Sequence, residues 1–133
     1  MVTIEWAFFC DMALIDRYHR LSIIGISPRI PTPTIPIAVR HSMLVAKMNA
    51  PEGERIDFGI RIAAPSGLVA VLTPDDQDVS VESAHGFLLV TMRNLPLPEE
   101  GTYRFELMVN GQIAATVPLS VLVTSPSESG GVH

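Results

Sequence analysis

The stretch GTYRFELMVNGQ, residues 101–112, and the run IAATVPLSVLV that follows it, residues 113–123, decide the fold of this chain. Hydrophobic residues recur at every second position on both sides of Asn110-Gly111. An Asn-Gly pair between two such runs is the strongest short-range signal of a β-hairpin. The stretch therefore predicts two antiparallel strands that each bury one face.

The positions of the hydrophobic residues predict the length of this hairpin loop. A two-residue loop would put the alternating hydrophobic positions of the two strands on opposite faces. A three-residue loop that includes Val109 pairs Leu107 with Ile113 and Phe105 with Ala115, so that both sets share one face. We therefore predict a three-residue loop, with Gly111 in the left-handed conformation of a bulge.

Eleven prolines and nine glycines divide the rest of the 133 residues into short hydrophobic runs. We predict no helix longer than about two turns, because Pro or Gly interrupts most candidate windows. The four prolines in Ser27–Ile37 predict an extended connection from one sheet to the other. Eight or nine runs with strand character predict an all-β, antiparallel β-sandwich of about eight strands, with a small barrel as the alternative. The predicted strands are Val2–Met12, Leu21–Ser27, Ile37–Met48, Ile56–Ala63, Leu68–Leu72, Val79–Glu82, Phe87–Met92, Thr102–Met108 and Ile113–Val123.

The pattern Gly-x-Tyr-x-Phe-x-Leu at residues 101–107 follows a Pro/Glu-rich corner and precedes a hairpin and a Val-rich last strand. This arrangement resembles strands F and G of immunoglobulin-like sandwiches. The resemblance implies that Tyr103 forms a tyrosine corner, with its hydroxyl bonded to backbone near Leu95–Glu100. Phe105 stands where antibody domains carry their second core cysteine. The resemblance implies a fold and no function.

The first half of the chain is similar to a family of small uncharacterised bacterial proteins. The similarity lies in Phe9-Cys10-Asp11, the polar loop after them, the run Leu21–Ile26, and the proline-spaced connection. It implies a bacterial all-β domain without an assigned activity or site. We expect a single β-sandwich domain at residues 1–124 and a flexible Ser/Gly/Pro tail at residues 125–133.

Composition excludes several classes of protein. Hydrophobic residues make up 47% of the chain and charged residues 17%, which argues against a wholly disordered chain. The net charge of -5 gives no basic patch for nucleic acid. No hydrophobic run is long enough to span a membrane, and the first residues do not resemble a signal peptide, so we expect a cytoplasmic protein. Cys10 is the only cysteine, so no disulfide can form within the chain.

The first two predicted strands are hydrophobic on both faces. If Phe8 faces the core, Phe9 faces solvent, and Ile23 conflicts with Ile24 and Ile26 in the same way. An exposed hydrophobic sheet face usually marks a partner site. We therefore expect a non-enzymatic protein-interaction or assembly module, most simply a homo-oligomer, that acts through a hydrophobic sheet face or an edge strand. The alternative is that a loop or the tail covers this face. The candidate binding residues are Phe9, Ala13, Ile24 and Ile26.

The runner-up is a small-ligand or Ca²⁺-dependent binding domain that uses loops at one end of the sandwich. Its candidate residues are Asp75, Asp76 and Asp78, with His85, although a solvated turn explains the three aspartates better, because three carboxylates are too few for Ca²⁺ without help from another loop. No two histidines have the local spacing of metal ligands. Cys10 fits a small core residue better than a nucleophile. We find no catalytic motif, and we expect neither an enzyme nor a cofactor.

Overall fold

The computed structural model describes residues 2–51, 53 and 55–124. These residues form eleven strands and no helix, so the all-β prediction and the absence of long helices are confirmed for this part of the chain. The predicted tail, residues 125–133, lies outside the described residues. The strands are β1 (Thr3–Cys10), β2 (Met12–Ile15), β3 (Leu21–Ile24), β4 (Arg29–Thr32), β5 (Ile37–Asn49), β6 (Phe58–Ala63), β7 (Val69–Leu72), β8 (Val79–Ala84), β9 (Phe87–Leu97), β10 (Gly101–Val109) and β11 (Gln112–Val123).

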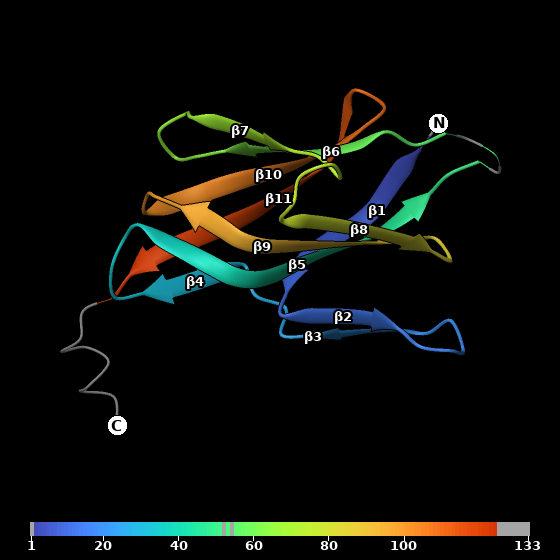
Figure 1. Cartoon of the computed structure of the whole chain (residues 1–133), viewed down its shortest axis with the longest axis horizontal. Coiled ribbons are helices and arrows are strands. Elements are labelled where there is room, and N and C mark those ends of the chain that lie inside the picture. The colour runs from blue at the N-terminus through green and yellow to red at the C-terminus, as the bar shows by residue number, and fades with distance from the viewer. Residues whose placement is uncertain (1, 52, 54, 125–133) are drawn as a thin grey trace.

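Nine of these strands form two stacked sheets (Figure 1). The four-stranded sheet has the order β1-β5-β9-β8, and the five-stranded sheet has the order β4-β11-β10-β6-β7. The inward faces of both sheets form one core around Leu44, Ile60 and Phe105. The arrangement is not wholly antiparallel, because β4 pairs with β11 in parallel.

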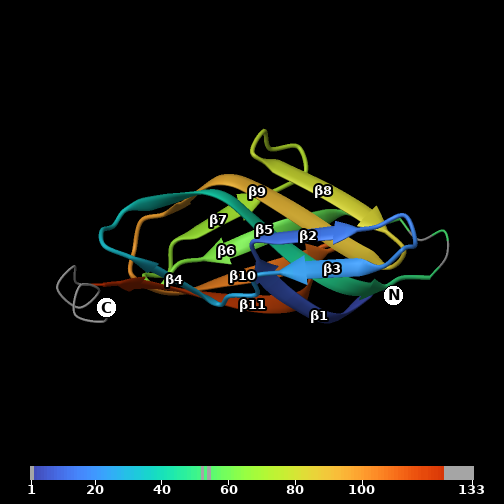
Figure 2. The same cartoon turned by 90° about the horizontal axis from the view of Figure 1, so that it is seen from below.

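The strands β2 and β3 form a separate hairpin, which makes a third layer on the outer face of the four-stranded sheet (Figure 2). The prediction of one continuous strand from Val2 to Met12 is wrong. The strand breaks at Asp11, so that β1 pairs with β5 while β2 pairs with β3. The break moves the hairpin out of the plane of the sheet, and this placement decides which hydrophobic residues become exposed.

The proline-spaced connection, which the sequence predicts to be extended, contains the short strand β4. β4 is an edge strand, paired only with β11 within the described residues. Pro31 is tolerated in it because an edge strand can leave one side of its backbone without ladder partners. The connection also crosses between sheets as predicted, since β4 belongs to the five-stranded sheet and β5 to the four-stranded one.

The loop of the last hairpin has two residues, so the predicted three-residue loop is wrong. Val109 pairs with Gln112, and Asn110 and Gly111 have φ values of 52° and 81°, as a tight hairpin turn requires. The extra residue lies instead in β11, where the register shifts so that Leu107 pairs with Ala115. This bulge at Ala114 puts the hydrophobic residues of both strands on one face. The prediction obtains the same result by placing the extra residue in the loop.

A second bulge, in β1, reverses the predicted orientation of its aromatic residues. The register with β5 shifts between Ile4 and Trp6, so Ile4 and Phe9 face the same core although their positions differ by an odd number. Phe9 is 5% exposed, and its ring meets the edge of Phe105 at a centroid distance of 4.6 Å. Phe8 is 39% exposed and stacks on Trp6 outside the core. The predicted outward position of Phe9 is therefore wrong.

The corner that leads into β10 is held by Tyr103, as predicted. The buried phenol oxygen of Tyr103 accepts a hydrogen bond from the Glu99 amide at 2.7 Å and donates one to the Glu99 carbonyl at 3.0 Å. Burial raises the pKa of this phenol. The hydroxyl therefore satisfies both backbone groups of a residue in the loop between β9 and β10.

We expect the substitution Tyr103→Phe to lower the free energy of unfolding by about 0.5–1.5 kcal/mol, because it removes the partner of both Glu99 backbone groups. Urea denaturation should show a lower midpoint with an unchanged slope. The control is Tyr18→Phe, since Tyr18 is exposed and its hydroxyl only accepts a bond from Arg17. Equal midpoints for Tyr103→Phe and the wild type would contradict the corner.

The pair Phe8 and Phe9 tests the bulge in β1. Phe9→Ala should cost about 3–5 kcal/mol, because it opens a cavity between the sheets. Phe8→Ala should cost only about 1 kcal/mol, since that ring is already partly in water. Denaturation of both variants measures the difference. A larger loss for Phe8→Ala would mean that β1 faces the other way.

Candidate functional site

The hairpin β2–β3 covers the hydrophobic outer face of the four-stranded sheet. Its inward side chains pack on a second hydrophobic cluster that is separate from the main core. The Ala13 amide also donates a hydrogen bond to the Met43 sulfur at 3.3 Å. The inward side chains are Ala13, Ile15, Leu21 and Ile23, and the cluster beneath them contains Cys10, Met43, Val45 and Leu89. Ala13 is thus buried, and its predicted place in an exposed binding face is wrong.

The other face of the same hairpin remains exposed. Met12 pairs with Ile24, and Leu14 lies on the same side because side chains alternate along a strand. Ile26 and Phe8 are exposed as well, and together with Val117 and Pro118 of β11 they line a groove of about 370 Å³. We call the set the hairpin surface, and its members are Phe8, Met12, Leu14, Ile24 and Ile26, all at least 39% exposed.

The hairpin surface contains two of the four binding residues that the sequence predicted, Ile24 and Ile26. Sequence reasoning missed Met12 and Leu14, although β2 is hydrophobic at all four positions and so must present hydrophobic side chains on both faces. Phe8 was missed for another reason. A bulge carries no signature in composition, so the sequence offers no signal that Phe8 turns outward.

Backbone bonds hold the root of the hairpin to the sandwich. The Asp11 amide donates to the carbonyls of Ile24 at 3.0 Å and Gly25 at 3.2 Å, and the Ser27 amide donates to the Phe9 carbonyl at 3.1 Å. Gly25 has φ +72°, a value that favours glycine. These bonds fix where the two strands leave the sheet, so the hairpin surface has a defined position.

The tip of the hairpin is organised by Asp16. Its carboxylate accepts hydrogen bonds from the amides of Tyr18 and Arg20 and pairs with the Arg20 guanidinium at 2.8 Å. The bond from the Arg20 amide is the main reason that the pKa of Asp16 is lowered. The His19 ring stacks on His85, in the turn between β8 and β9, at a centroid distance of 3.7 Å. The structure thus joins two histidines whose spacing in sequence predicted no pairing.

The acidic loop does not assemble the predicted calcium site with His85. The six-residue strand β8, about 20 Å long at 3.3 Å per residue, separates Asp78 from His85. Asp76 accepts a hydrogen bond from the Thr73 amide at 2.6 Å, which is what a solvated turn requires. Among the described residues, no group of three or more His, Cys, Asp or Glu side chains could hold a metal ion.

Cys10 lies in the cluster beneath the hairpin, as a small hydrophobic residue does. Burial, followed by the nearby Asp11 charge, raises the pKa of its thiol. The thiolate is therefore disfavoured, which works against nucleophilic chemistry at this position. Across the part of the chain that the structure describes, no helix is long and hydrophobic enough to cross a membrane.

These features define an all-β protein of two stacked sheets, with a hairpin that covers one outer face and leaves its own hydrophobic face exposed. Residues 5–122 match the Family of unknown function (DUF6941), and the chain belongs to this family. The match spans every strand except the first residues of β1 and the last residue of β11. No curated protein matches the chain.

If Asp75, Asp76 and Asp78 form only a solvated turn, replacing all three with Asn should change stability by less than about 0.5 kcal/mol, since exposed changes of this kind have small effects. Thermal unfolding with millimolar Ca²⁺ and with a chelator measures this. A rise of several degrees in the wild-type melting temperature with Ca²⁺, lost in the triple variant, would support the calcium-binding alternative.

Proposed function

We propose that this chain is a non-enzymatic protein-interaction or assembly module that acts through the hairpin surface. The supporting observation is that three of the four outward side chains of β2 and β3 are hydrophobic and exposed, namely Met12, Leu14 and Ile24, with Ser22 as the exception, and that no described residue covers them. A hairpin that served only as a cover would carry polar side chains on its solvent face, as half-buried antiparallel strands do. Ile24 and Ile26 are instead 57% and 56% exposed.

We propose further that the two sheets form an immunoglobulin-like sandwich. The order β1-β5-β9-β8 corresponds to strands A-B-E-D, and β11-β10-β6-β7 corresponds to G-F-C-C′. The bonds from Tyr103 to Glu99, four residues upstream, have the form of a tyrosine corner. In this assignment the hairpin β2–β3 is an insertion after strand A, and the remaining strands supply a scaffold that presents it.

The partner that we propose is a second copy of this chain. A two-fold contact brings the same surface of both copies together, so the surface must be complementary to itself. None of the five residues of the hairpin surface is charged, and self-pairing therefore brings no like charges together there. A standard interface buries about 800 Å² on each partner, so residues around the hairpin surface would also be covered.

The substitution Ile24→Asp tests this proposal. A carboxylate at the centre of a hydrophobic contact must lose its hydration, so we expect the dimer to dissociate into monomers. Sedimentation velocity at several protein concentrations measures the change. The side chain points into solvent, so circular dichroism and the melting temperature should remain close to those of the wild type.

The matched control is Leu68→Asp. Leu68 is 69% exposed in the turn between β6 and β7, on the opposite side of the molecule from the hairpin (Figure 1). This variant adds the same charge and should leave the dimer intact. A wild-type protein that remains monomeric at concentrations of hundreds of micromolar would refute self-association, and equal dissociation by both variants would show that the hairpin surface is not the contact.

A further inference from the structure

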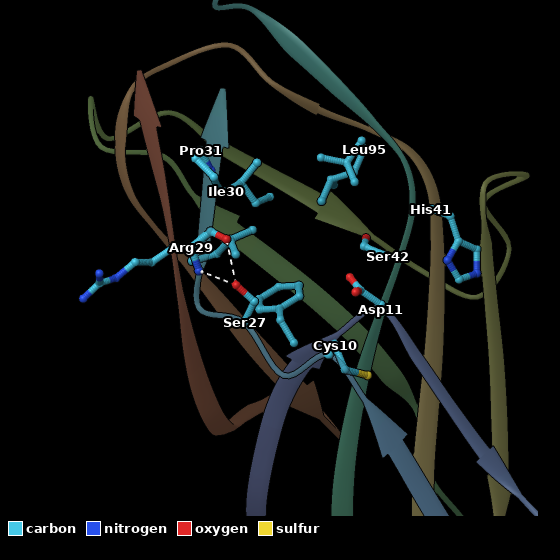
Figure 3. A pocket seen from close by; sticks show the side chains of 13 residues that line it. Cys10, Asp11, Ser27, Arg29, Ile30, Pro31, His41, Ser42 and Leu95 are labelled. Carbon is cyan, nitrogen blue, oxygen red and sulfur yellow. Dashed lines mark hydrogen bonds between the residues drawn. The ribbon is translucent and has the colours of Figure 1, made fainter. Parts of the chain in front are cut away.

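A cavity of about 350 Å³ opens between the two sheets near the root of the hairpin. It lies where β4 of one sheet and β5 of the other run close together without pairing. Side chains from both sheets line it (Figure 3). Its volume is at the small end of the range for ligand sites in proteins.

The interior of the cavity is hydrophobic. The four-stranded sheet supplies Phe9, Val39 and Leu95, and the five-stranded sheet supplies Ile30 and Leu119. A ligand in the cavity would therefore contact hydrophobic side chains of both sheets. A short hydrophobic chain could therefore be removed from water by entering the space.

One carboxylate lies at the mouth of this cavity. In Figure 3 the Asp11 side chain points toward Ser42, whereas the guanidinium of Arg29 points away from the cavity. No side chain among the described residues hydrogen-bonds to the Asp11 carboxylate or forms an ion pair with it. Because an ionised carboxylate only accepts hydrogen bonds, the mouth favours a cationic donor and disfavours an anion.

Two features of the chain place this carboxylate at the mouth: a held backbone at Asp11 and free space at Gly25. The Asp11 amide donates to the carbonyls of Ile24 and Gly25, which fixes the backbone. A Cβ atom at position 25 would clash with the Asp11 Oδ2 atom, so only glycine leaves room for the carboxylate where it stands. The same glycine has positive φ. A negative charge therefore lies beside a hydrophobic space.

We propose that this cavity binds a short alkylammonium group. The hydrocarbon part contacts the interior, and the ammonium donates hydrogen bonds to the Asp11 carboxylate and to the Ser42 hydroxyl oxygen. The group could belong to a free primary amine or to a lysine side chain, since both carry an ammonium on a short alkyl chain. The net charge of -5 also favours the approach of a cation.

The ion pair makes a modest contribution because Asp11 is exposed to water. Exposed pairs change an equilibrium by about two- to fivefold, and most of the affinity comes from burying the alkyl chain. A neutral molecule of the same shape should therefore bind in the same place, two- to fivefold more weakly. The ratio of the two affinities, cationic over neutral, therefore measures the contribution of Asp11.

The experiment compares n-pentylamine with 1-pentanol, in amide-resolved NMR titrations of the full chain at constant ionic strength. We expect saturable shifts for Asp11, Gly25, Ser42 and Leu119, with pentylamine binding two- to fivefold more tightly than pentanol. Asp11→Asn should remove this preference while pentanol binds as before. The control Asp75→Asn should keep it. Gly25→Ala, which displaces the carboxylate, should also remove it, and the spectra without ligand show whether each variant is folded.

Two results would overturn the proposal: no saturable shifts at the cavity with either compound, or the same preference for the amine in Asp11→Asn. A third titration uses Nα-acetyl-lysine-N-methylamide to distinguish the two sources. Binding of this compound at the same residues identifies a lysine side chain as a ligand that the cavity accepts. Binding of pentylamine alone identifies a free amine, and either result supports the alkylammonium site.

Discussion

The contact between Phe9 and Phe105 determines much of the rest of this structure. These rings meet edge to face between the two sheets, with an interplanar angle of 82°, and this contact requires β1 to turn Phe9 inward. Neighbouring side chains on a strand point to opposite faces, so Trp6 and Phe8 must then turn outward. The four-stranded sheet consequently carries hydrophobic residues on its outer face, and that face needs a cover.

The hairpin β2–β3 covers the outer face of the four-stranded sheet. It exposes a hydrophobic face of its own in turn. Its inward face buries the cluster around Met43 and Leu89, but its outward face is also hydrophobic except at Ser22. Among the described residues, the outward face has no partner. The backbone bonds of Asp11 at the root and the stack of His19 on His85 at the tip hold the hairpin at both ends. The exposed hydrophobic face is therefore carried on a positioned element, which is what a recognition surface needs.

The two proposed sites share the root of this hairpin. Asp11 follows β1 and stands at the mouth of the cavity between the sheets, and Gly25 follows β3 and leaves room for the Asp11 carboxylate. The hairpin surface and the cavity are thus built from the same break in the first strand.

The sequence by itself determined the features that depend on local chemistry. The Tyr103 corner, the Asn-Gly turn and the absence of helices from the described residues all follow from residue types at short spacings, because turns and breaks in the chain depend on nearby backbone geometry. The sequence also placed Ile24 and Ile26 on an exposed face.

Tertiary structure alone decided the rest. Two bulges shift the alternation of side chains by one residue. The bulge in β1 turns Phe9 inward and Phe8 outward, and the bulge in β11 takes the extra residue that the prediction places in the last loop. A bulge arises where two strands must match each other, and that match involves residues about forty positions apart in the case of β1 and β5. The stack of His19 on His85 and the cavity beside Asp11 likewise depend on how separate elements pack, which no local pattern records.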